Sequence, residues 1–489
     1  MRHHLAESSM IGTTSGLTQQ RLVRFAVCIF TAYGVAGLAQ SPPQPPITVP
    51  MFSPAERAQI TAFWMQPGRV THGLPRNIVT NGLWQVRPDP DGSAWLLKYQ
   101  IAEGAASAPP TLAPTAVQSL PQQQAWHNWV IAAIAWDKYR AQITADQDNE
   151  RLQVGTQLGL EGVAPPPPGP MPADLQAACG DAPPFADVVA PQTATVTFDD
   201  GSHFTFQDHT DVPLDYAYYR FPTGTDSGGT PVRLMPKPKV DSLFARAGLT
   251  EPEANAAKAV SMLEGGFDSV NTYDTGFVSI GFLQFITAGT GNGDLMHVLE
   301  REKQDNQAAF NQDFHQYGID VTPTGILDVV NPDTGSELVG PDAVMAVIRY
   351  KRLTAVFVHA GAKSDAFKIA QIETAGADYW PANDPVTVTV NGTVITGLVS
   401  DVVHSEAGMT TLFDRKVNRG SINPFPAVLQ QVMQEHNLTT IAAAAPYERD
   451  IIKLCIYRHN FLKDKDLSQP PPSPVTVKPS LSTSAGTKQ

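Results

Sequence analysis

Apolar residues recur every three or four positions in several segments of the chain, which is the pattern of helices with one buried face. The pattern is clearest in residues 249–266, where Thr250 and Glu253 form the capping pair that starts a helix. Two glycines then end this helix and place Glu264 at its C-terminal end. Further helices are predicted over residues 53–64, 122–146, 294–315, 340–359, 363–375, 404–418, 426–436 and 446–463.

Alternation of apolar and polar residues predicts two β-hairpins. Residues 193–208 alternate around an Asp-Gly pair and residues 386–397 around an Asn-Gly pair, and both pairs are typical of hairpin turns. The segment 214–221, which holds three tyrosines and a phenylalanine, is predicted to add a third strand to the first hairpin. This β-rich part is either a brace without chemistry or a surface that binds carbohydrate through its aromatic side chains.

Residues 122–146 carry Trp126, Trp129 and Trp136 at helical spacing. Such a row can stack on sugar rings, but tryptophans at this spacing more often form the buried face of a helix. We interpret the row as a core face, and sugar stacking stays the alternative.

Proline-rich stretches separate these patterned segments. The patterns predict a multidomain α+β protein, in which a small helical block and a β-rich module precede a mainly helical domain with a β-hairpin. The expected divisions are a signal peptide at 1–39, a proline-rich spacer at 40–50, the helical block at 51–160, a proline-rich linker at 161–175, the β-rich module at 176–240, the mainly helical domain at 241–465 and a disordered tail at 466–489.

The N-terminal stretch "RLVRFAVCIFTAYGVAGLAQ" at residues 21–40 has a basic start, an apolar run and small residues near its end. This order is typical of an export signal that is cleaved, here just before Gln40. The alternative is an uncleaved anchor. The pattern predicts a protein that is exported to the periplasm or the extracellular space, with membrane contact only through the signal.

The chain carries 47 acidic and 34 basic residues, for a formal net charge of −13. This balance disfavours nucleic acid as a partner, because phosphate binding needs clustered Lys and Arg, and it is compatible with neutral or cationic polymers. No Cys and His spacing indicates a zinc site, so no metal or cofactor is predicted. Cys28 would leave with the signal, and Cys179 and Cys455 could then form one disulfide. The sequence leaves the oligomeric state open.

Glu264 is the strongest candidate for chemistry. A carboxyl group beside apolar residues at the negative end of a helix dipole is favoured in its protonated form, and it can then donate a proton to a glycosidic oxygen. The glycines after Glu264 leave open backbone where a polymer could approach. Glycosidases use two carboxyl groups, and the second candidate is Asp274, with Asp268 as the runner-up. The alternative is that Glu264 is an ordinary surface residue at a helix end.

The residues that follow Glu264 resemble the lytic transglycosylases and goose-type lysozymes. In that pattern a catalytic Glu at a helix end is followed by Ser-x-Gly-Leu-Met-Gln, and the stretch "SIGFLQF" at residues 279–285 matches its Ser, Gly and Gln. The resemblance implies a lysozyme-like α-fold in which two lobes surround a sugar-binding cleft.

A second resemblance, to the bacterial chitosanases, covers overlapping residues. The stretch 274–300 is similar to their Asp-containing segment and aligns Asp274 with the second catalytic carboxylate, and 410–421 resembles a later helix of that family. Together the resemblances span about residues 245–465. Two features depart from the patterns: the spacing from Glu264 to Asp274 is shorter than in chitosanases, and the hairpin at 386–397 occurs in neither pattern.

The resemblances imply roles for individual residues. Glu264 would be the general acid, and Asp274 would activate water or stabilise positive charge on the sugar in the transition state. The remaining candidates would hold the substrate, and they are Asn271, Tyr273, Ser279, Gln284, Asp414 and Asn418. Each has a structural alternative, such as turn formation for Asn271, core packing for Tyr273, a backbone hydrogen bond for Gln284 and a cap or ion pair for Asp414.

These features predict an exported glycoside hydrolase or lytic transglycosylase that cleaves a β-1,4-linked amino-sugar polymer, either peptidoglycan or chitosan. The alternative is a non-catalytic protein that binds glycan, or organises a cell-envelope complex, through a lysozyme-like module. Whether Glu264 opens into a cleft discriminates between the two.

Overall fold

The computed structural model describes residues 50–75, 78–103, 120–152 and 164–474. The predicted signal peptide and almost all of the proline-rich spacer lie outside these residues, as does the end of the predicted tail. The described chain combines helices with several small sheets, which confirms the predicted mixture of α and β structure. None of the described helices is both long enough and apolar enough to span a bilayer.

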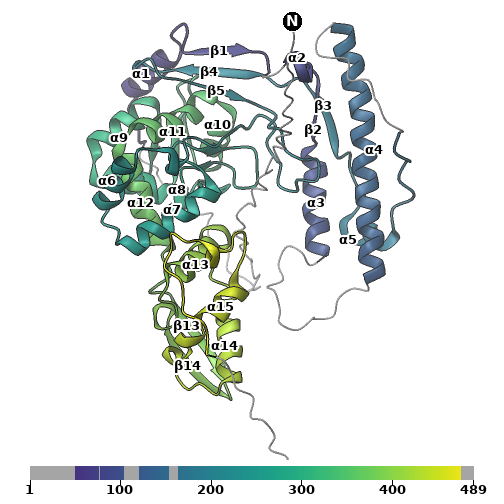
Figure 1. The fold of residues 1–489 in the computed structure, drawn as a ribbon. Coiled ribbons are helices and arrows are strands. Elements are labelled where there is room, and N and C mark those ends of the chain that lie inside the picture. Colours follow the sequence, from purple (N-terminus) through teal and green to yellow (C-terminus); the bar gives the residue numbers. More distant parts are fainter. Residues whose placement is uncertain (1–49, 76–77, 104–119, 153–163, 475–489) are drawn as a thin grey trace, which may run out of the picture.

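The largest part of the molecule surrounds one hydrophobic core, drawn in teal and green in Figure 1. Its centre is aromatic and includes Phe282, Phe357 and Phe367, which are all fully buried. Short strands lie between its helices in two small sheets, β6-β7-β8-β9 and β10-β11-β12. The elements of this part are β6 (Asp226–Ser227), α6 (Lys237–Arg246), α7 (Glu251–Glu264), β7 (Val270–Asn271), β8 (Ser279–Ile280), β9 (Phe285–Ile286), α8 (Asp294–Asp305), α9 (Gln307–Asp313), β10 (Ile319–Val321), β11 (Leu327–Val330), β12 (Glu337–Val339), α10 (Pro341–Arg349), α11 (Lys351–Lys363) and α12 (Asp365–Tyr379).

Elements from the N-terminal half of the chain belong to the same core. Strand β1 pairs antiparallel with β4, which pairs with β5, so this sheet joins residues on both sides of the predicted 161–175 linker. Trp64 at the end of the first helix is buried and donates from its indole nitrogen to the backbone oxygen of Tyr317, at 3.0 Å. The elements are α1 (Pro54–Trp64), β1 (Val70–Gly73), β4 (Thr193–Thr197) and β5 (His203–Gln207).

A separate layer of helices stands to the right in Figure 1. Its small core contains Trp95, Trp126 and Phe185, which makes Trp126 a core residue, whereas Trp129 is half-buried and donates to the backbone oxygen of Gly169. Strands β2 and β3 pair antiparallel beside these helices. The layer consists of α2 (Ile78–Asn81), β2 (Gln85–Pro88), α3 (Pro90–Ala102), α4 (Leu120–Leu152), α5 (Ala173–Cys179) and β3 (Ala186–Val189).

A C-terminal lobe, yellow in Figure 1, lies below the main part and has a second hydrophobic core of its own. The predicted hairpin forms β13 and β14, and its turn residues Asn391 and Gly392 both have positive φ, as an Asn-Gly hairpin turn requires. The hairpin packs on α14 rather than on the end of α7. The elements are β13 (Pro385–Val390), β14 (Thr393–Leu398), α13 (Glu406–Arg419), α14 (Phe425–Glu435) and α15 (Glu448–Cys455).

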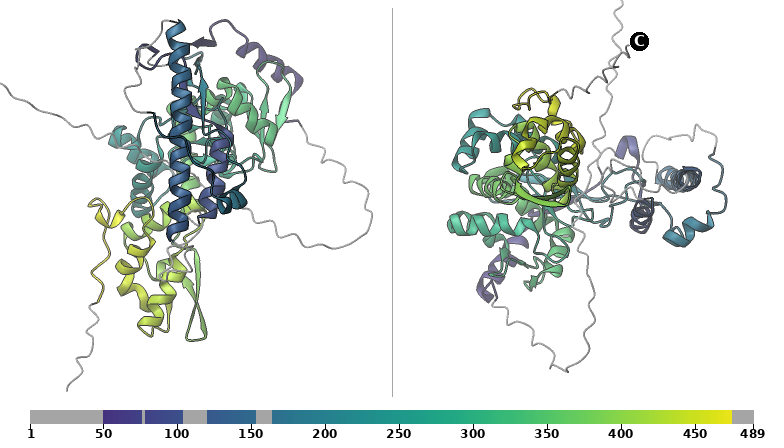
Figure 2. Two further views of the ribbon diagram at one scale, coloured as in Figure 1. Left: turned by 90° about the vertical axis from the view of Figure 1, so that its right-hand side faces the viewer. Right: turned by 90° about the horizontal axis from the view of Figure 1, so that it is seen from below.

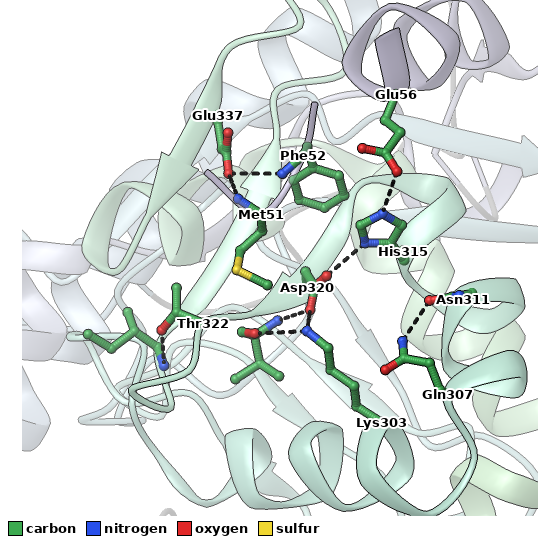
Figure 3. A network of polar contacts seen from close by, with 12 residues as sticks. Met51, Phe52, Glu56, Lys303, Gln307, Asn311, His315, Asp320, Thr322 and Glu337 are labelled. Atoms are coloured by element: carbon green, nitrogen blue, oxygen red, sulfur yellow. Dashed lines mark hydrogen bonds and ion pairs between the residues drawn. The ribbon is translucent and has the colours of Figure 1, made fainter. Parts of the chain in front are cut away.

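The N-terminal segment is fastened to β12 through one carboxylate (Figure 3). Glu337 accepts hydrogen bonds from the backbone nitrogens of Met51, at 2.6 Å, and Phe52, at 3.4 Å. Its other oxygen accepts from Arg57 of α1 at 3.0 Å. The first described residues are therefore held by a side chain that follows them by 286 positions.

His315 makes a second attachment of the same segment (Figure 3). Its Nδ1 lies 2.7 Å from Asp320 and its Nε2 lies 3.4 Å from Glu56 of α1. The Nζ of Lys303 donates to the same Asp320 carboxylate at 2.6 Å. The hydrogen bond to Asp320 raises the pKa of His315, and Phe52 stacks on the imidazole ring with 4.6 Å between ring centroids.

Several expectations differ in detail from the structure. Residues 214–221 form no strand, and only an isolated bridge joins Tyr219 to Asp274. The third strand of the sheet that contains the hairpin β4–β5 is β1, which pairs with β4. The cysteines do not pair, because Cys179 and Cys455 are buried free thiols in two different hydrophobic clusters. The predicted helix over 294–315 is broken at Asn306 into α8 and α9.

Candidate active site

Helix α7 carries Glu264 to the border between the main part and the C-terminal lobe. The helix begins where the Glu253 carboxylate accepts hydrogen bonds from the backbone nitrogen and the hydroxyl of Thr250, at 2.8 and 2.7 Å. It ends after Glu264 at Gly265, whose φ is 155°. A Cβ on Gly265 would lie 2.7 Å from the side chain of Ser269, so only glycine fits this close approach.

The chain after Glu264 returns as a small antiparallel sheet. Strands β7, β8 and β9 follow α7 directly, and β6 pairs with β7 at the edge. Gly266 lies against the backbone of Thr230, where a Cβ would come within 2.1 Å of the carbonyl oxygen. The glycine pair therefore lets the turn pack against the 228–231 segment.

Glu264 is held by two residues of the C-terminal lobe. Its Oε1 accepts a hydrogen bond from the guanidinium of Arg458 at 2.7 Å and another from the amide nitrogen of Asn418 at 3.1 Å. The side chains of Glu264 and Arg458 are 9% and 8% exposed, so this ion pair is largely shielded from water. The predicted apolar surroundings of Glu264 thus include a cation and an amide.

Asp414 shares both of these partners with Glu264. Its Oδ1 lies 2.5 Å from the same Arg458 nitrogen and 3.2 Å from the amide nitrogen of Asn418. Because Glu264 Oε1 and Asp414 Oδ1 accept from the same guanidinium nitrogen, the two carboxyl groups are close neighbours. Burial raises the pKa of Asp414, and the positive charge of Arg458 offsets that effect only in part. Although burial acts to lower the pKa of Arg458, the charges of Glu264 and Asp414 raise it overall.

A pocket of about 260 Å³ adjoins Glu264. Its walls are the end of α7, from Ser261 to Gly265, and the segment 228–233. Arg233 also lines the pocket, so one acidic and one basic side chain contribute to its walls. Glu264 therefore meets an open space in addition to its buried partners, and the hairpin β13–β14 takes no part in these walls.

Asp274 occupies a different setting. It is 2% exposed, and its two oxygens accept hydrogen bonds from the side chain of Asn271, at 2.5 Å, and the backbone nitrogen of Gly276, at 2.8 Å. Asp274 is absent from the walls of the pocket beside Glu264. The structure thus joins Asp274 to Asn271 within the turn between β7 and β8, and it places neither of them on that pocket.

Tyr273 belongs to an aromatic cluster. It is 2% exposed, and its ring contacts Tyr216 and Tyr219, with 6.0 and 6.2 Å between the centroids. Burial raises the pKa of Tyr216, and the charge of Asp274 adds to this effect. The tyrosines of the 214–221 segment therefore pack around Tyr273.

Ser279 and Gln284 are both buried in or beside the small sheet. The amide nitrogen of Gln284 donates to the hydroxyl of Ser269 at 2.7 Å and to the backbone oxygen of Gly281 at 3.0 Å. Gly281 has a φ of +86°, and a Cβ there would lie 2.1 Å from the amide oxygen of Gln371. These contacts support the turn that follows β8.

Asp268, the runner-up for the second carboxylate, accepts a hydrogen bond from the backbone nitrogen of Thr230 at 2.7 Å and so supports the 228–233 segment beside the pocket.

The structure therefore brings together Glu264, Asp414 and Asn418 from the predicted set. Sequence reasoning missed Arg458, which lies 194 positions after Glu264 in the loop that follows α15. The only available signal was a basic residue near the end of the region of resemblance, in "YRHNF" at 457–461. No group of three or more His, Cys, Asp or Glu side chains among the described residues is arranged to hold a metal ion.

No protein-family model, no curated protein and no solved structure matches this chain.

Proposed function

We propose that the protein is an exported glycan-cleaving enzyme in which Glu264 donates the proton to the bond that breaks. The observation that carries the proposal is the position of Glu264 at the end of a helix, against a pocket and before a small antiparallel sheet. The resemblance to lytic transglycosylases and lysozymes covers these same residues. The substrate we favour is peptidoglycan, and chitosan is the second choice.

The hydrogen bonds of Glu264 are compatible with a proton donor. Oε1 takes the bonds from Arg458 and Asn418, so Oε2 is the oxygen that would carry a proton. Glu264, Asp414 and Arg458 together carry one net negative charge when both acids are ionised, and one added proton makes the cluster neutral. Burial raises the pKa of Asp414 and the charge of Glu264 adds to this effect, so a state of the pair with a single negative charge is favoured. Glu264 adjoins the pocket, so donation to a substrate would take place from this residue.

The reaction would proceed in two stages. Glu264 first gives its proton to the glycosidic oxygen, the bond to the anomeric carbon breaks and the leaving sugar departs with that proton. The Glu264 carboxylate then accepts a proton from the hydroxyl that attacks the anomeric carbon. The attacking hydroxyl comes from water, which gives a reducing end, or from C6 of the same sugar, which gives a 1,6-anhydro end. Since Asp274 is no part of the pocket and both its oxygens accept hydrogen bonds, we favour the route with one carboxyl group.

The test is turnover of purified peptidoglycan and chitosan by the wild type and by Glu264→Gln. The matched control is Glu251→Gln, because Glu251 lies exposed in the first turn of the same helix. Loss of general acid catalysis costs about 100-fold or more, so Glu264→Gln should lose that much turnover while the control keeps it. Mass spectrometry of the fragments distinguishes 1,6-anhydro from reducing ends.

The second candidate function is glycan binding without cleavage. It is favoured by the ion pair that joins Glu264 to Arg458, because such a pair can also be purely structural. A wild-type protein that sediments with peptidoglycan but releases no fragments would favour this function and refute the catalytic one. Equal turnover by the wild type and Glu264→Gln would remove Glu264 from the reaction.

A further inference from the structure

A second pocket, of about 360 Å³, lies far along the chain from Glu264, where α1 and β1 meet the junction of α10 and α11. One wall comes from the end of α1 and the loop that leads to β1, and it includes Trp64, Pro67 and Val70. The other wall is the sequence "RYKR" at 349–352. Figure 1 shows these elements side by side at the upper left of the molecule, and Figure 2 gives the same region from two other directions.

The second wall concentrates positive charge in an acidic protein. Arg349, Lys351 and Arg352 all line the pocket, although the chain as a whole has a formal net charge of −13. His72 of β1 faces the same space. No acidic side chain is among the residues that line this pocket.

These cations are only partly neutralised by the protein. Arg352 pairs with Asp333, whereas no ion pair joins Arg349 or Lys351 to another residue in the described part of the chain. Lys351 instead donates to the backbone oxygens of Thr223 and, at 3.4 Å, Ile348. Burial lowers the pKa of Lys351 to about 8, and the charge of Asp208 only partly opposes this effect.

The helix geometry adds to the positive potential. Lys351 and Arg352 begin α11, and the first turn of that helix carries no acidic residue. Cations at a helix N-terminus face the positive end of the helix dipole, which is unfavourable unless an anion lies nearby. With one of the three cations neutralised, about two positive charges remain, which matches the charge of a phosphate monoester near neutral pH. Arginine forks also fit the oxygen geometry of phosphate.

We propose that this pocket binds the phosphate group of a small phosphorylated molecule. Arg349 and Arg352 would hold the phosphate oxygens, and the half of the pocket formed by Trp64, Pro67 and Val70 would contact the organic part. A volume of about 360 Å³ is within the range of small-molecule sites. The site is separate from Glu264 and does not depend on the proposed glycan cleavage.

The proposal is tested by calorimetric titration of the full chain with inorganic phosphate, glycerol 3-phosphate and acetate. Wild type is compared with Arg349→Gln, which breaks no ion pair, and with Arg349→Lys, which keeps the charge but loses the fork. Lys453→Gln, on the exposed surface of α15, is the control for the change in net charge. Because a hydrogen bond to a charged group contributes more than a neutral one, Arg349→Gln should weaken phosphate binding about tenfold or more. Lys453→Gln should leave phosphate binding unchanged.

The outcomes separate the sources of the ligand. Tighter binding of glycerol 3-phosphate than of phosphate assigns the pocket to an organic phosphate, and equal binding assigns it to the free anion. Acetate that binds as well as phosphate, no binding up to millimolar concentrations, or binding that survives Arg349→Gln would overturn the proposal.

Labelling of Lys351 by an amine-reactive ester gives a second readout that does not depend on calorimetry. At pH 8 the amine is partly neutral and reactive, because its pKa is about 8. Added phosphate should slow the labelling of Lys351 by raising that pKa and by covering the amine, and it should leave the exposed Lys453 unaffected. Equal labelling of Lys351 with and without phosphate counts against the site.

Discussion

The substitution Arg458→Met tests how the C-terminal lobe is joined to α7. Arg458 is the cation shared by Glu264 and Asp414, at 2.7 and 2.5 Å, and all three side chains are at most 9% exposed. Removal of one partner from a buried ion pair costs about 3–5 kcal/mol, because it leaves a charge that is neither paired nor hydrated. Methionine keeps most of the volume of the arginine stem, so the expected loss of about 3–5 kcal/mol comes from the charge rather than from a cavity.

The assay is unfolding by urea, followed by circular dichroism and by tryptophan fluorescence, with a free energy accepted only where the two transitions coincide. The double variant Arg458→Met with Asp414→Asn removes one of the two carboxylates that the single variant deprives of their cation, and it leaves only Glu264 charged. It should therefore be more stable than Arg458→Met alone. The control Lys453→Met removes an exposed pair with Asp450 and should cost less than about 1 kcal/mol. A cost below about 1 kcal/mol for Arg458→Met, or a double variant that is less stable than the single one, would refute the reasoning.

Three further predictions follow from single positions. Gly392→Ala should cost about 1 kcal/mol, because Gly392 has positive φ but no atom within 4 Å of the added Cβ. Gly281→Ala should cost more, because Gly281 also has positive φ and its added Cβ would meet Gln371. Equal urea midpoints for the two variants would contradict this. Phe282→Ala should cost about 3–5 kcal/mol, since Phe282 is fully buried in the main core; thermal and urea unfolding measure it, and a loss below about 1 kcal/mol would show that the core closes around the gap. Stability should fall between about pH 4 and pH 8, because burial and the charge of Glu337 raise the pKa of Asp328 from 3.8 to about 8, and the fall should steepen above about pH 6.5, because the hydrogen bond to Asp320 raises the pKa of His315 from 6.5. Both groups then bind protons more tightly in the folded state, so their contribution is complete at low pH and is lost as the pH rises through the folded pKa values; urea midpoints across this range check the sign, and Asp328→Asn should flatten the fall.

Local patterns predicted local structure well. The capping pair at Thr250, the Asp-Gly turn and the Asn-Gly turn each correspond to a helix start or a hairpin in the structure, because every one of them is decided by neighbours within a few residues. The break of the helix at Asn306 was missed, although the Asn306 side chain accepts a hydrogen bond from the backbone nitrogen of Ala309 and so caps α9. An asparagine inside an otherwise helical pattern was a signal that could have been used.

Contacts between distant segments could not be predicted. Strand β1 pairs with β4 across more than a hundred residues, and nothing in the four residues of β1 specifies that partner. The same holds for Arg458, whose contact with Glu264 depends on how the C-terminal lobe docks on α7. Periodicity identified Glu264 as the end of a helix, but the charge that it meets there comes from packing and is not encoded in its local sequence.

The attachment of the first helix to Glu337 has a consequence for the order of events during synthesis. Arg57 leaves the ribosome 280 residues before the carboxylate that it binds. At about 5–20 residues per second, α1 must wait roughly 15–55 seconds before this partner exists. During the first part of that time the apolar face of α1, with Ile60 and Trp64, also lacks its contacts with Tyr317 and strand β11. The N-terminal segment is therefore made first, but its attachment to Tyr317 and Glu337 is completed late.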